Sequence, residues 1–328
     1  MERDNMSQYA GQTVYITGGG NGIGRALALA FASRGANLAL VDILPDGLTE
    51  TEAAARSAGA PKVTNHIADV SNREQVDRVA SEVLSAHGEV HYLFANAGVG
   101  LTGIPLDKVR PEELEWSFSV NVFGVFHSIQ SLLPSIKAHG KPAHILSTAS
   151  VAGLFTPPGT HLSAYSSAKF ALPAIMQGFR DSLEGTPVKV STIYPGLTKT
   201  NVEQRSQDLR PVVEGAVAPM PSFVSPLNGE DAGAVSERII KGMEAGFHHI
   251  FPHTEVAREQ HDAYSQMIAN GLSNSFSRTS SSARNYRSRR GQTARSTGSS
   301  AAITSMRRVR WTPTSSRCLV QRLIPSSR

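Results

Sequence analysis

Short apolar, β-branched runs alternate with helical patterns along most of the chain, and this alternation is the strongest constraint on its fold. The runs have the length and near-continuous apolar character of strands that are buried on both faces. Six of them are clear and a seventh is weaker: Thr13–Thr17, Asn37–Val41, Val63–Ile67, Tyr92–Ala95, His144–Thr148 and Val188–Tyr194, with the weaker run at His248–Phe251.

Helical patterns separate these runs. They lie at 23–35, 73–88, 111–140 and 164–185, and several of them end in glycine, the common residue just past a helix C-terminus. Buried strands that alternate with helices form a parallel sheet, and its crossover connections are right-handed. We therefore predict an α/β, doubly wound Rossmann fold with a mostly seven-stranded parallel sheet and helices on both faces.

Composition excludes several protein classes. The 328 residues, 40% of them hydrophobic and 18% charged, suffice for one large α/β domain or two small ones. Cys318 is the single cysteine, so an internal disulfide framework and a cysteine-based metal cluster are excluded. No run approaches the roughly 18 apolar residues of a membrane helix, and the opening M-E-R-D-N-M-S-Q-Y-A-G-Q has no apolar core. We expect a reducing, cytoplasmic location and no membrane partner.

The net charge of +5 is unevenly distributed. Gly271 to Arg328 holds twelve Arg and no Asp, Glu, Lys or His, so this segment carries +12 and the first 270 residues carry −7. The basic pI is therefore no argument that the main domain binds nucleic acid. We expect one folded domain over 1–272, with a proline-rich lid at about 197–230, and a disordered basic Arg/Ser-rich segment over 273–328. A nucleic-acid or anionic-membrane arm, an inert extension and out-of-frame translation remain open for this segment, and the last two are favoured.

A glycine-rich turn, T-G-G-G-N-G-I-G at 17–24, follows the first strand and runs directly into a helix. Gly18, Gly22 and Gly24 permit a sharp turn, close approach to a pyrophosphate and packing of the helix against the sheet. The helix N-terminus offers free N–H groups and the positive end of its dipole to phosphates. The place of this turn after the first strand of an alternating chain favours a nucleotide site.

Tyr165 stands four residues before Lys169 in the stretch A-Y-S-S-A-K-F. On a helix the two side chains share one face, one turn apart. A surface pair without function is the common meaning of an isolated Tyr-x-x-x-Lys. The alternative is an acid–base pair, in which the ammonium lowers the phenol pKa from its ordinary value of about 10.

Further motifs in a fixed order decide between these readings. N-A-G-V at 96–99 follows the fourth strand, Asn121 lies in V-N-V-F-G, and S-T-A-S-V-A-G precedes Y-S-S-A-K. Y-P-G-L-T-K-T follows the sixth strand. Together with T-G-x-x-x-G-I-G, these motifs resemble the classical short-chain dehydrogenase/reductase family over roughly residues 10 to 255. The resemblance implies that 1–272 is a single Rossmann-fold catalytic domain. It also implies hydride transfer between a nicotinamide cofactor, NAD or NADP, and a secondary alcohol or ketone.

The same resemblance assigns four catalytic roles. Tyr165 is expected to be the general acid/base, and Lys169 to lower its pKa and hold the nicotinamide ribose. Ser150 is expected to hydrogen-bond the substrate oxygen. Asn121 is expected to hold a water that links Lys169 to solvent. The segment between Ser150 and Tyr165 is slightly longer than is usual in the family, which leaves its loop geometry open.

The resemblance also implies a dinucleotide site. Asp42, eighteen residues after Gly24, would accept hydrogen bonds from the adenine ribose and repel a 2′-phosphate, which favours NAD over NADP. The alternative is that Asp42 only caps the next helix. No metal is expected, because the histidines lack ligand spacing. The expected cofactor-binding residues are Gly18, Asn21, Gly22, Ile23, Gly24, Asp42, Asp69, Val70, Asn96, Ala97, Gly98, Tyr165, Lys169, Pro195, Gly196 and Thr198.

Substrate and assembly are less sharply indicated. Leu154, Phe155, His161, Leu162 and the lid after Gly196 are expected to line a pocket for a hydrophobic or aromatic secondary alcohol. The helices that hold Asn121 and Tyr165 are apolar on more than one face, and the resemblance implies a homodimer or homotetramer. The alternative function is a catalytically lapsed dinucleotide-binding regulatory or scaffold protein. Retention of all four catalytic positions favours the enzyme.

Overall fold

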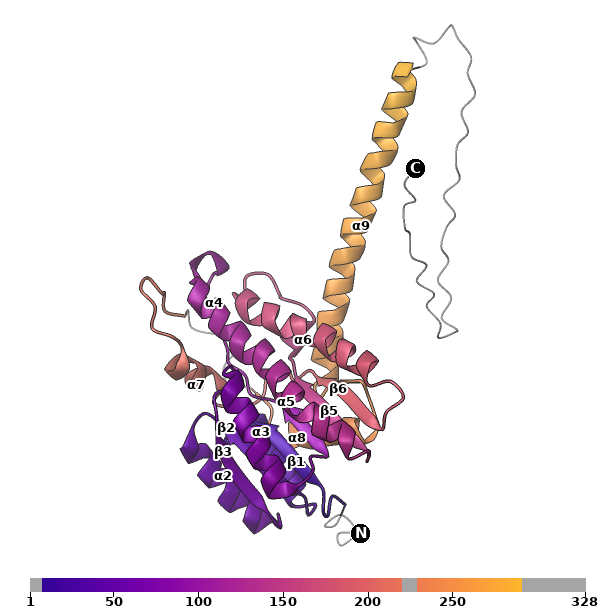
Figure 1. Ribbon diagram of the computed structural model, residues 1–328. Helices are drawn as coiled ribbons and strands as arrows, with labels where there is room; N and C mark the ends of the chain where they lie inside the picture. The colour runs from indigo at the N-terminus through magenta and orange to yellow at the C-terminus, as the bar shows by residue number, and fades with distance from the viewer. Residues whose placement is uncertain (1–7, 220–228, 291–328) are drawn as a thin grey trace, which may run out of the picture. The chain divides into compact units, whose positions relative to one another are not determined.

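The computed structural model describes residues 8–219 and 229–290 (Figure 1). The chain divides into two compact units, Met1–Gly271 and Leu272–Arg328. The first unit holds the sheet. Helix α9, Thr254–Arg290, begins in the first unit and continues into the second. Residues 291–328, most of the segment for which the sequence predicts disorder, lie outside the described residues.

The first unit contains a seven-stranded parallel sheet with the strand order β3-β2-β1-β4-β5-β6-β7. All six strand pairings are parallel, which confirms the predicted doubly wound α/β fold. No strand limit differs from the sequence expectation by more than one residue. The strands are β1 Thr13–Thr17, β2 Asn37–Asp42, β3 Val63–Ile67, β4 Tyr92–Ala95, β5 Ala143–Thr148, β6 Val188–Ile193 and β7 His249–Ile250.

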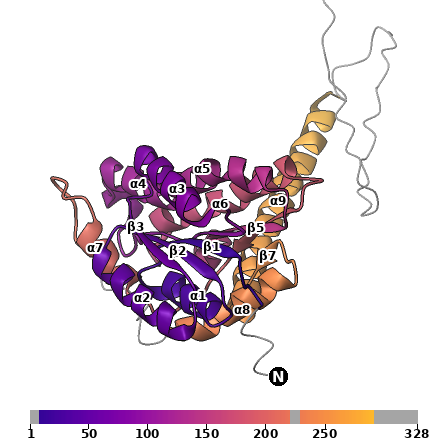
Figure 2. The ribbon, with the colours of Figure 1, turned by 60° about the horizontal axis from the view of Figure 1, so that its bottom comes forward.

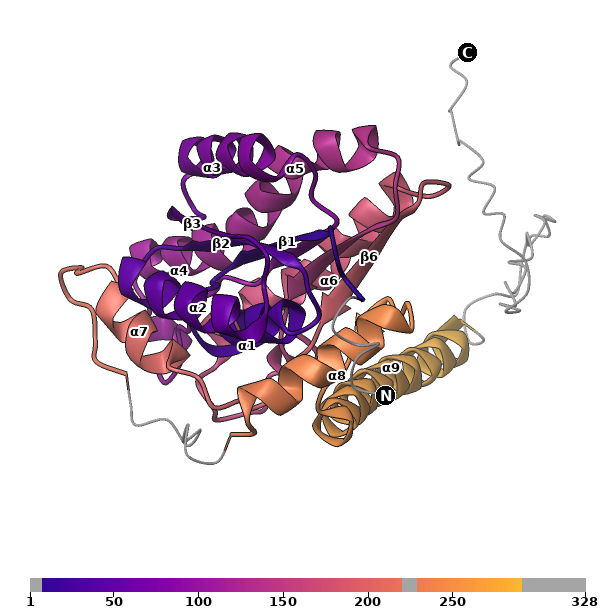
Figure 3. The same ribbon diagram turned by 90° about the horizontal axis from the view of Figure 1, so that it is seen from below.

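Helices cover both faces of this sheet, as Figures 2 and 3 show. α3, α4, α5 and α6 lie on one face, and α1, α2 and α8 lie on the other. The limits are α1 Gly22–Ala32, α2 Pro45–Ala58, α3 Arg73–His87, α4 Pro111–Phe118, α5 Gly124–Ala138, α6 Ser163–Ser182, α7 Val202–Leu209 and α8 Ala232–Glu244.

Two apolar cores result from the alternation of side chains along each strand. On β1, Val14 and Ile16 point to one face and pack in the same core as Phe31 of α1. Tyr15 points to the other face and packs in the core that contains Ile129 of α5. All five residues of β1 are buried, because helices cover the sheet on both sides.

The predicted helix at 111–140 is interrupted in the structure. α4 ends at Phe118, a π-helical turn occupies Ser119–Phe123, and α5 follows from Gly124. Such a turn inserts one residue into the helical register and re-aims the side chains around it, and it is frequent at functional sites. Here it holds Asn121, whose side chain is fully buried.

The lid region expected at 197–230 is closed at its base. Thr198 and Glu230 form an isolated parallel bridge, and the N–H of Lys199 donates to the Glu230 carbonyl at 2.8 Å. Between these ends the chain forms the short helix α7 and then irregular backbone. Residues 220–228 of the lid lie outside the described part of the chain. Within residues 8–219 and 229–290, no helix combines the length and apolar character that a bilayer crossing requires.

Candidate active site

A cleft of about 670 Å³ opens at the carboxyl ends of the strands. The strand order changes direction between β1 and β4, and crevices at such switch points bind ligands in doubly wound folds. The lining comes from the ends of β1, β2, β4, β5 and β6, together with α6 and α7. All but one of the residues that the sequence singled out for catalysis or cofactor binding line this cleft.

Gly24 is the exception. A Cβ atom at Gly24 would overlap the carbonyl oxygen of Gly18, so this glycine allows α1 to pack against the turn that precedes it. Gly18 and Gly22 have positive φ angles of 67° and 53°, which residues with side chains rarely adopt. Asn21 is the N-cap of α1 and accepts a hydrogen bond from the Gly22 N–H at 2.6 Å.

Asp42 ends β2 and lies beside the glycine turn. Its carboxylate accepts one hydrogen bond from the N–H of Gly20 at 3.0 Å and one from the N–H of Leu44 at 3.1 Å. The carboxylate therefore fixes the turn between β1 and α1 and the start of the β2–α2 connection. It also faces the cleft, where a ribose would bind.

Asn96 ties three strand ends together at the floor of the cleft. Its N–H donates to the Thr17 hydroxyl at 2.9 Å, and its side-chain amide donates to the Thr17 carbonyl at 3.0 Å. The Thr148 hydroxyl donates to its amide oxygen at 3.0 Å. Asp69 lies near the other end of the cleft and accepts hydrogen bonds from the N–H and hydroxyl of Ser71.

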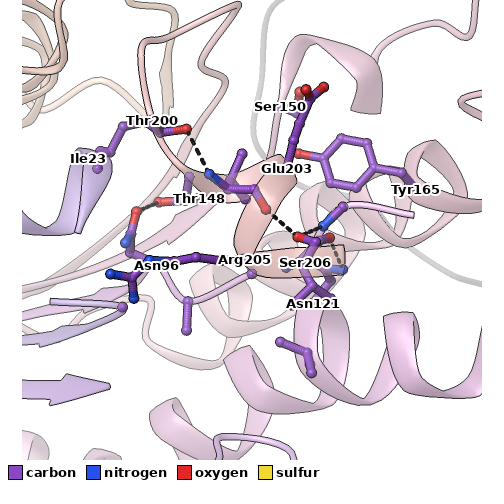
Figure 4. Close-up of a pocket in the computed structure, with 18 of the residues that line it drawn as sticks. Ile23, Asn96, Asn121, Thr148, Ser150, Tyr165, Thr200, Glu203, Arg205 and Ser206 are labelled. Atoms are coloured by element: carbon purple, nitrogen blue, oxygen red, sulfur yellow. Dashed lines mark hydrogen bonds between the residues drawn. The ribbon is translucent and has the colours of Figure 1, made fainter. Parts of the chain in front are cut away.

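Tyr165 and Ser150 come together in the cleft (Figure 4), which Lys169 also lines. Tyr165 and Lys169 lie one turn apart on α6, and Ser150 follows β5. The Tyr165 hydroxyl points toward Ser150, whose nearby hydroxyl lowers the pKa of the phenol. Lys169 is buried, with 3% exposure, and its Nζ donates to the Thr148 carbonyl at 2.9 Å.

Burial sets the pKa values of this pair. It raises the pKa of the Tyr165 phenol above the ordinary value, and the Ser150 hydroxyl lowers it in part. Burial also lowers the pKa of Lys169 to about 8. The ammonium was expected to lower the phenol pKa, but burial of the phenol raises this pKa instead. The reason is geometric, since Lys169 faces the ring, with Nζ 5.6 Å from its centroid, and directs a hydrogen bond to Thr148.

Asn121 lies directly behind Lys169. Its side-chain amide donates to the carbonyls of Val99 and Ser117 at 2.9 Å each, and its oxygen accepts from the Val99 N–H at 3.2 Å. Gly98 fits between the two functional groups, because a Cβ there would lie 2.8 Å from Asn121 Oδ1 and 3.2 Å from Lys169 Nζ. The N-A-G-V stretch thus permits close approach of the amide and the amine.

The lid helix α7 supplies residues that the sequence analysis did not name. The sequence of this region has no clear hydrophobic periodicity, so it did not indicate that its side chains would line the cleft. The sequence motifs indicate Thr198 and not Thr200, although the side chain of Thr200 packs against Gly22. The cleft residues contributed by the start of the lid and by α7 are Thr200, Asn201, Val202, Glu203, Arg205, Ser206 and Leu209.

His253 has a defined contact at the base of the lid. Its Nδ1 accepts a hydrogen bond of 2.9 Å from the N–H of Gly196, and its Nε2 lies 3.2 Å from the Glu230 carboxylate. Burial lowers the pKa of His253. The Pro195–Gly196 turn and the base of the lid are therefore held by one imidazole.

The expected substrate-pocket residues are only partly borne out. Leu162 lines the cleft, whereas Leu154, Phe155 and His161 do not. Phe155 instead packs toward Tyr264 of α9, with their ring centroids 6.4 Å apart. The longer Ser150–Tyr165 segment carries these side chains away from the cleft.

A glycine turn at the switch point of a parallel sheet defines a dinucleotide-binding protein. Acid–base side chains in the same cleft place it among the oxidoreductases. A family model described as short chain dehydrogenase matches residues 12–210. The C alpha-dehydrogenase of Sphingobium sp. is 30% identical over 280 residues, which cover 81% of this chain and 88% of that protein. The estradiol 17-beta-dehydrogenase 11 of Homo sapiens is 36% identical over 208 residues, covering 62% and 68%.

A solved structure gives the same result. A short chain dehydrogenase/reductase from Burkholderia phymatum, in complex with NAD, is similar with a TM-score of 0.74 at 30% identity, covering 80% of this chain and 96% of that one. The chain belongs to the short-chain dehydrogenase/reductase family, as its motifs predicted. It is an NAD(P)-dependent oxidoreductase that acts on alcohols.

Proposed function

We propose that this protein is an NAD-dependent dehydrogenase of a neutral, hydrophobic or aromatic secondary alcohol, with Tyr165 as its general acid/base. The observation that carries this proposal is that Tyr165, Ser150 and the buried amine of Lys169 line one cleft together with the glycine turn. The residues present fit a dinucleotide, because the turn at Gly18 and Gly22 leaves its inner face free of side chains.

Each catalytic side chain has a role that follows from its position. Tyr165 removes the proton of the substrate hydroxyl at its phenol oxygen. Ser150 donates a hydrogen bond to the substrate oxygen and stabilises the charge that develops there. The nicotinamide cofactor, when bound, supplies the hydride chemistry. Lys169, held by the Thr148 carbonyl, binds the ribose and provides the cation next to the phenol.

Asn121 positions the catalytic side chains through its hydrogen bonds with the backbone of Val99 and Ser117. We propose that Asn121 holds a water that links Lys169 to solvent, and the absence of a side chain at Gly98 permits close approach of the amide and the amine. A water there would hand protons from solvent to Lys169 and on to Tyr165. Asn121 belongs to the π-helical turn, which explains how a helix side chain reaches the backbone of Val99.

Asp42 supports NAD as the preferred cofactor. Asp42 is the last residue of β2. Its carboxylate lines the cleft, where it accepts hydrogen bonds from ribose hydroxyls and repels a 2′-phosphate. Two like charges about 4 Å apart cost on the order of 4 kcal/mol at an effective dielectric of 20, and less in an open cleft. The relative from Burkholderia phymatum was solved with NAD, which agrees with this preference.

The lining of the cleft supports a neutral apolar substrate. Glu203 of α7 lines the cleft and disfavours an anionic substrate. The human relative is named for estradiol, a large apolar alcohol. The apolar side chains near the catalytic end are Val99, Trp116, Val151, Leu162, Val202, Leu209 and Val256.

We also propose that the protein assembles as a homodimer or homotetramer through α5 and α6. Phe123 and Phe126 are 53% and 39% exposed at the start of α5, and Phe126 packs against Phe179 of α6 with ring centroids 5.7 Å apart. Such a continuous apolar surface on two adjacent helices favours burial against a second copy. Sedimentation at micromolar concentration should show an oligomer, and a stable monomer would contradict this proposal.

The catalytic domain is proposed to end near residue 272. Val256 is the last residue that lines the cleft, so a chain ending at residue 272 should retain full turnover. The single cysteine supports a reducing, cytoplasmic compartment. A lapsed, purely regulatory dinucleotide binder is the alternative function, but the assembled Tyr165, Lys169 and Ser150 favour the enzyme.

A panel of secondary alcohols and ketones tests the proposal. Turnover is followed by NADH absorbance, with NAD and NADP compared for each substrate. We expect turnover of hydrophobic or aromatic secondary alcohols with NAD and little turnover of sugars or hydroxy acids. Dinucleotide binding without turnover of any alcohol or ketone would favour the lapsed function instead.

A further inference from the structure

Arg205 is a cation without a protein partner in the cofactor cleft. It lies on the lid helix α7, is half-buried and lines the cleft together with Gly18, Asn21 and Asn96. Within residues 8–219 and 229–290, its guanidinium has no hydrogen-bond or ion-pair partner. Partial burial of an unpaired guanidinium is unfavourable, so this position is best explained by an anionic ligand.

The helix that carries Arg205 is anchored by two residues that follow Arg205 in the chain. Ser206 accepts a hydrogen bond of 2.7 Å from the N–H of Gly100. Arg210, at the C-terminal end of α7, forms an ion pair with Glu113 of α4, which is completely buried. Arg210 is thus fully engaged in holding the lid helix. Both anchors lie on the C-terminal side of Arg205, whose side chain lines the cleft.

Arg205 points toward the glycine turn. Figure 4 shows its side chain extending from α7 in the direction of Asn96. Asn96 contacts the turn directly, since a Cβ at Gly18 would lie 3.1 Å from its Nδ2 atom. A ligand between Arg205 and Gly18 would therefore have the lid helix on one side and the N-terminus of α1 on the other.

The glycine turn alone offers few donors for a doubly charged group. The N–H of Gly19 donates to the Val41 carbonyl, that of Gly20 to Asp42, and that of Gly22 to Asn21. Donors left for a ligand include the first N–H groups of α1, at Ile23 and Gly24, which have no intrahelical acceptor. Asp42 and Asp69 add negative charge to the same cleft.

We propose that Arg205 closes the diphosphate subsite from the lid side, its guanidinium donating to phosphate oxygens that face the glycine turn. This inference rests on the proposed dinucleotide-dependent function. A guanidinium matches phosphate oxygens in a bidentate fashion and keeps its charge at every working pH. Arg205 is therefore a binding residue for the cofactor, contributed by the lid.

The test compares the affinities of Arg205→Gln, Arg205→Lys and the wild-type chain for three ligands by calorimetry. NADH and ADP-ribose contain the diphosphate, and adenosine lacks it. Lys137→Gln is the matched control, because Lys137 is an exposed cation at the opposite end of α5 from Asn121 and does not line the cleft. Melting temperatures establish that each variant is folded.

Arg205→Gln should weaken NADH and ADP-ribose about tenfold or more, as expected for loss of a charge-assisted contact, and leave adenosine unchanged. Its NADH affinity should also depend less steeply on salt. Arg205→Lys should recover part of the affinity, and Lys137→Gln should match the wild type.

Two outcomes overturn the inference alone, provided that the wild type binds NADH. One is an ADP-ribose affinity that is unchanged in Arg205→Gln. This holds even if the variant loses activity toward alcohols that carry a carboxylate. The other is an equal loss of adenosine, which would indicate collapse of the lid. A wild-type chain that binds no dinucleotide would instead contradict the proposed function, and the inference with it.

Discussion

The ammonium nitrogen of Lys169 lies 5.6 Å from the ring centroid of Tyr165, the residue proposed to act on the substrate hydroxyl. The amine is buried and donates a hydrogen bond to the carbonyl of Thr148. Burial of an amine favours its neutral form, and the pKa of Lys169 falls to about 8. The charge that assists Tyr165 is therefore present below about pH 8 and is lost above it.

This shift makes stability depend on pH in a defined direction. Between about pH 8 and pH 10, Lys169 is largely neutral in the folded chain and protonated in the unfolded chain. The unfolded state then binds more protons, so the contribution of Lys169 to the free energy of unfolding increases as pH rises. The slope should approach about 1.4 kcal/mol per pH unit. Denaturant unfolding at several pH values measures it.

Lys169→Met is the matched variant for this prediction. The wild-type minus variant difference in unfolding free energy should rise from pH 8 to pH 10 and stay flat from pH 6 to pH 7. The range stops at pH 10 because burial raises the pKa of Tyr15 and Tyr194, which destabilises the folded chain at higher pH. A difference that is independent of pH throughout would show that the pKa of Lys169 is not lowered.

Gly98 is predicted to be required for the spacing of Asn121 and Lys169. In Gly98→Ala the new methyl group would meet Asn121 Oδ1 at 2.8 Å and Lys169 Nζ at 3.2 Å. Both groups must shift, which should lower kcat by about tenfold or more and the unfolding free energy by about 1–3 kcal/mol. Steady-state kinetics and denaturant unfolding provide the two measurements.

Gly100→Ala is the control in the same loop. Its nearest contact would be Ser206 Oγ at 3.7 Å, an ordinary packing distance. This variant should therefore stay close to the wild type in kcat and stability. Equal losses in the two variants would mean that the loop is generally intolerant, and that the contact at Gly98 has no particular role.

Asp42 is predicted to set the cofactor preference. Asp42→Asn removes the charge that repels a 2′-phosphate, so the ratio of kcat/KM for NADP to that for NAD should rise about tenfold or more. The variant should also be less stable. Gly20 and Leu44 each donate a hydrogen bond to a different oxygen of the carboxylate, and the amide of Asn keeps only one acceptor oxygen. Parallel kinetics with the two cofactors measure the ratio.

Asp69→Asn provides the comparison. It removes one carboxylate from the same cleft and disturbs only the turn at Ser71. The NADP to NAD ratio should remain near the wild-type value in this variant. If both variants changed the ratio equally, the preference would reflect the overall charge of the cleft, and Asp42 would have no specific part in it.

The sheet could be predicted closely from the sequence, because its strands are buried on both faces and read as apolar runs. β1, β3 and β4 have the predicted limits, and even the two-residue β7 lies within a predicted run. The helix α2 was missed because its polar and alanine-rich sequence carries a weak apolar face, although Pro45 begins it and Gly59 ends it with a positive φ angle of 113°.

Site residues that belong to sequence motifs could be predicted, whereas site residues that are placed only by tertiary contacts could not. The glycine turn, Asn96 and Tyr165 with Lys169 all reach one cleft, because they follow strand ends or share a helix face. Arg205 and His253 could not be identified in the same way. Their roles depend on how α7 and the β7–α9 connection return to the cleft, and short sequence periods do not encode those long-range placements.

The central claim, that the Tyr165 phenol performs the proton transfer, is tested most directly by Tyr165→Phe. The ring and its packing remain, and only the oxygen that contacts Ser150 is removed. With an alcohol that the wild type oxidises, NAD-linked turnover should fall by about a thousandfold while NADH affinity stays unchanged. Turnover at the wild-type rate in a variant that still binds NADH would contradict the account.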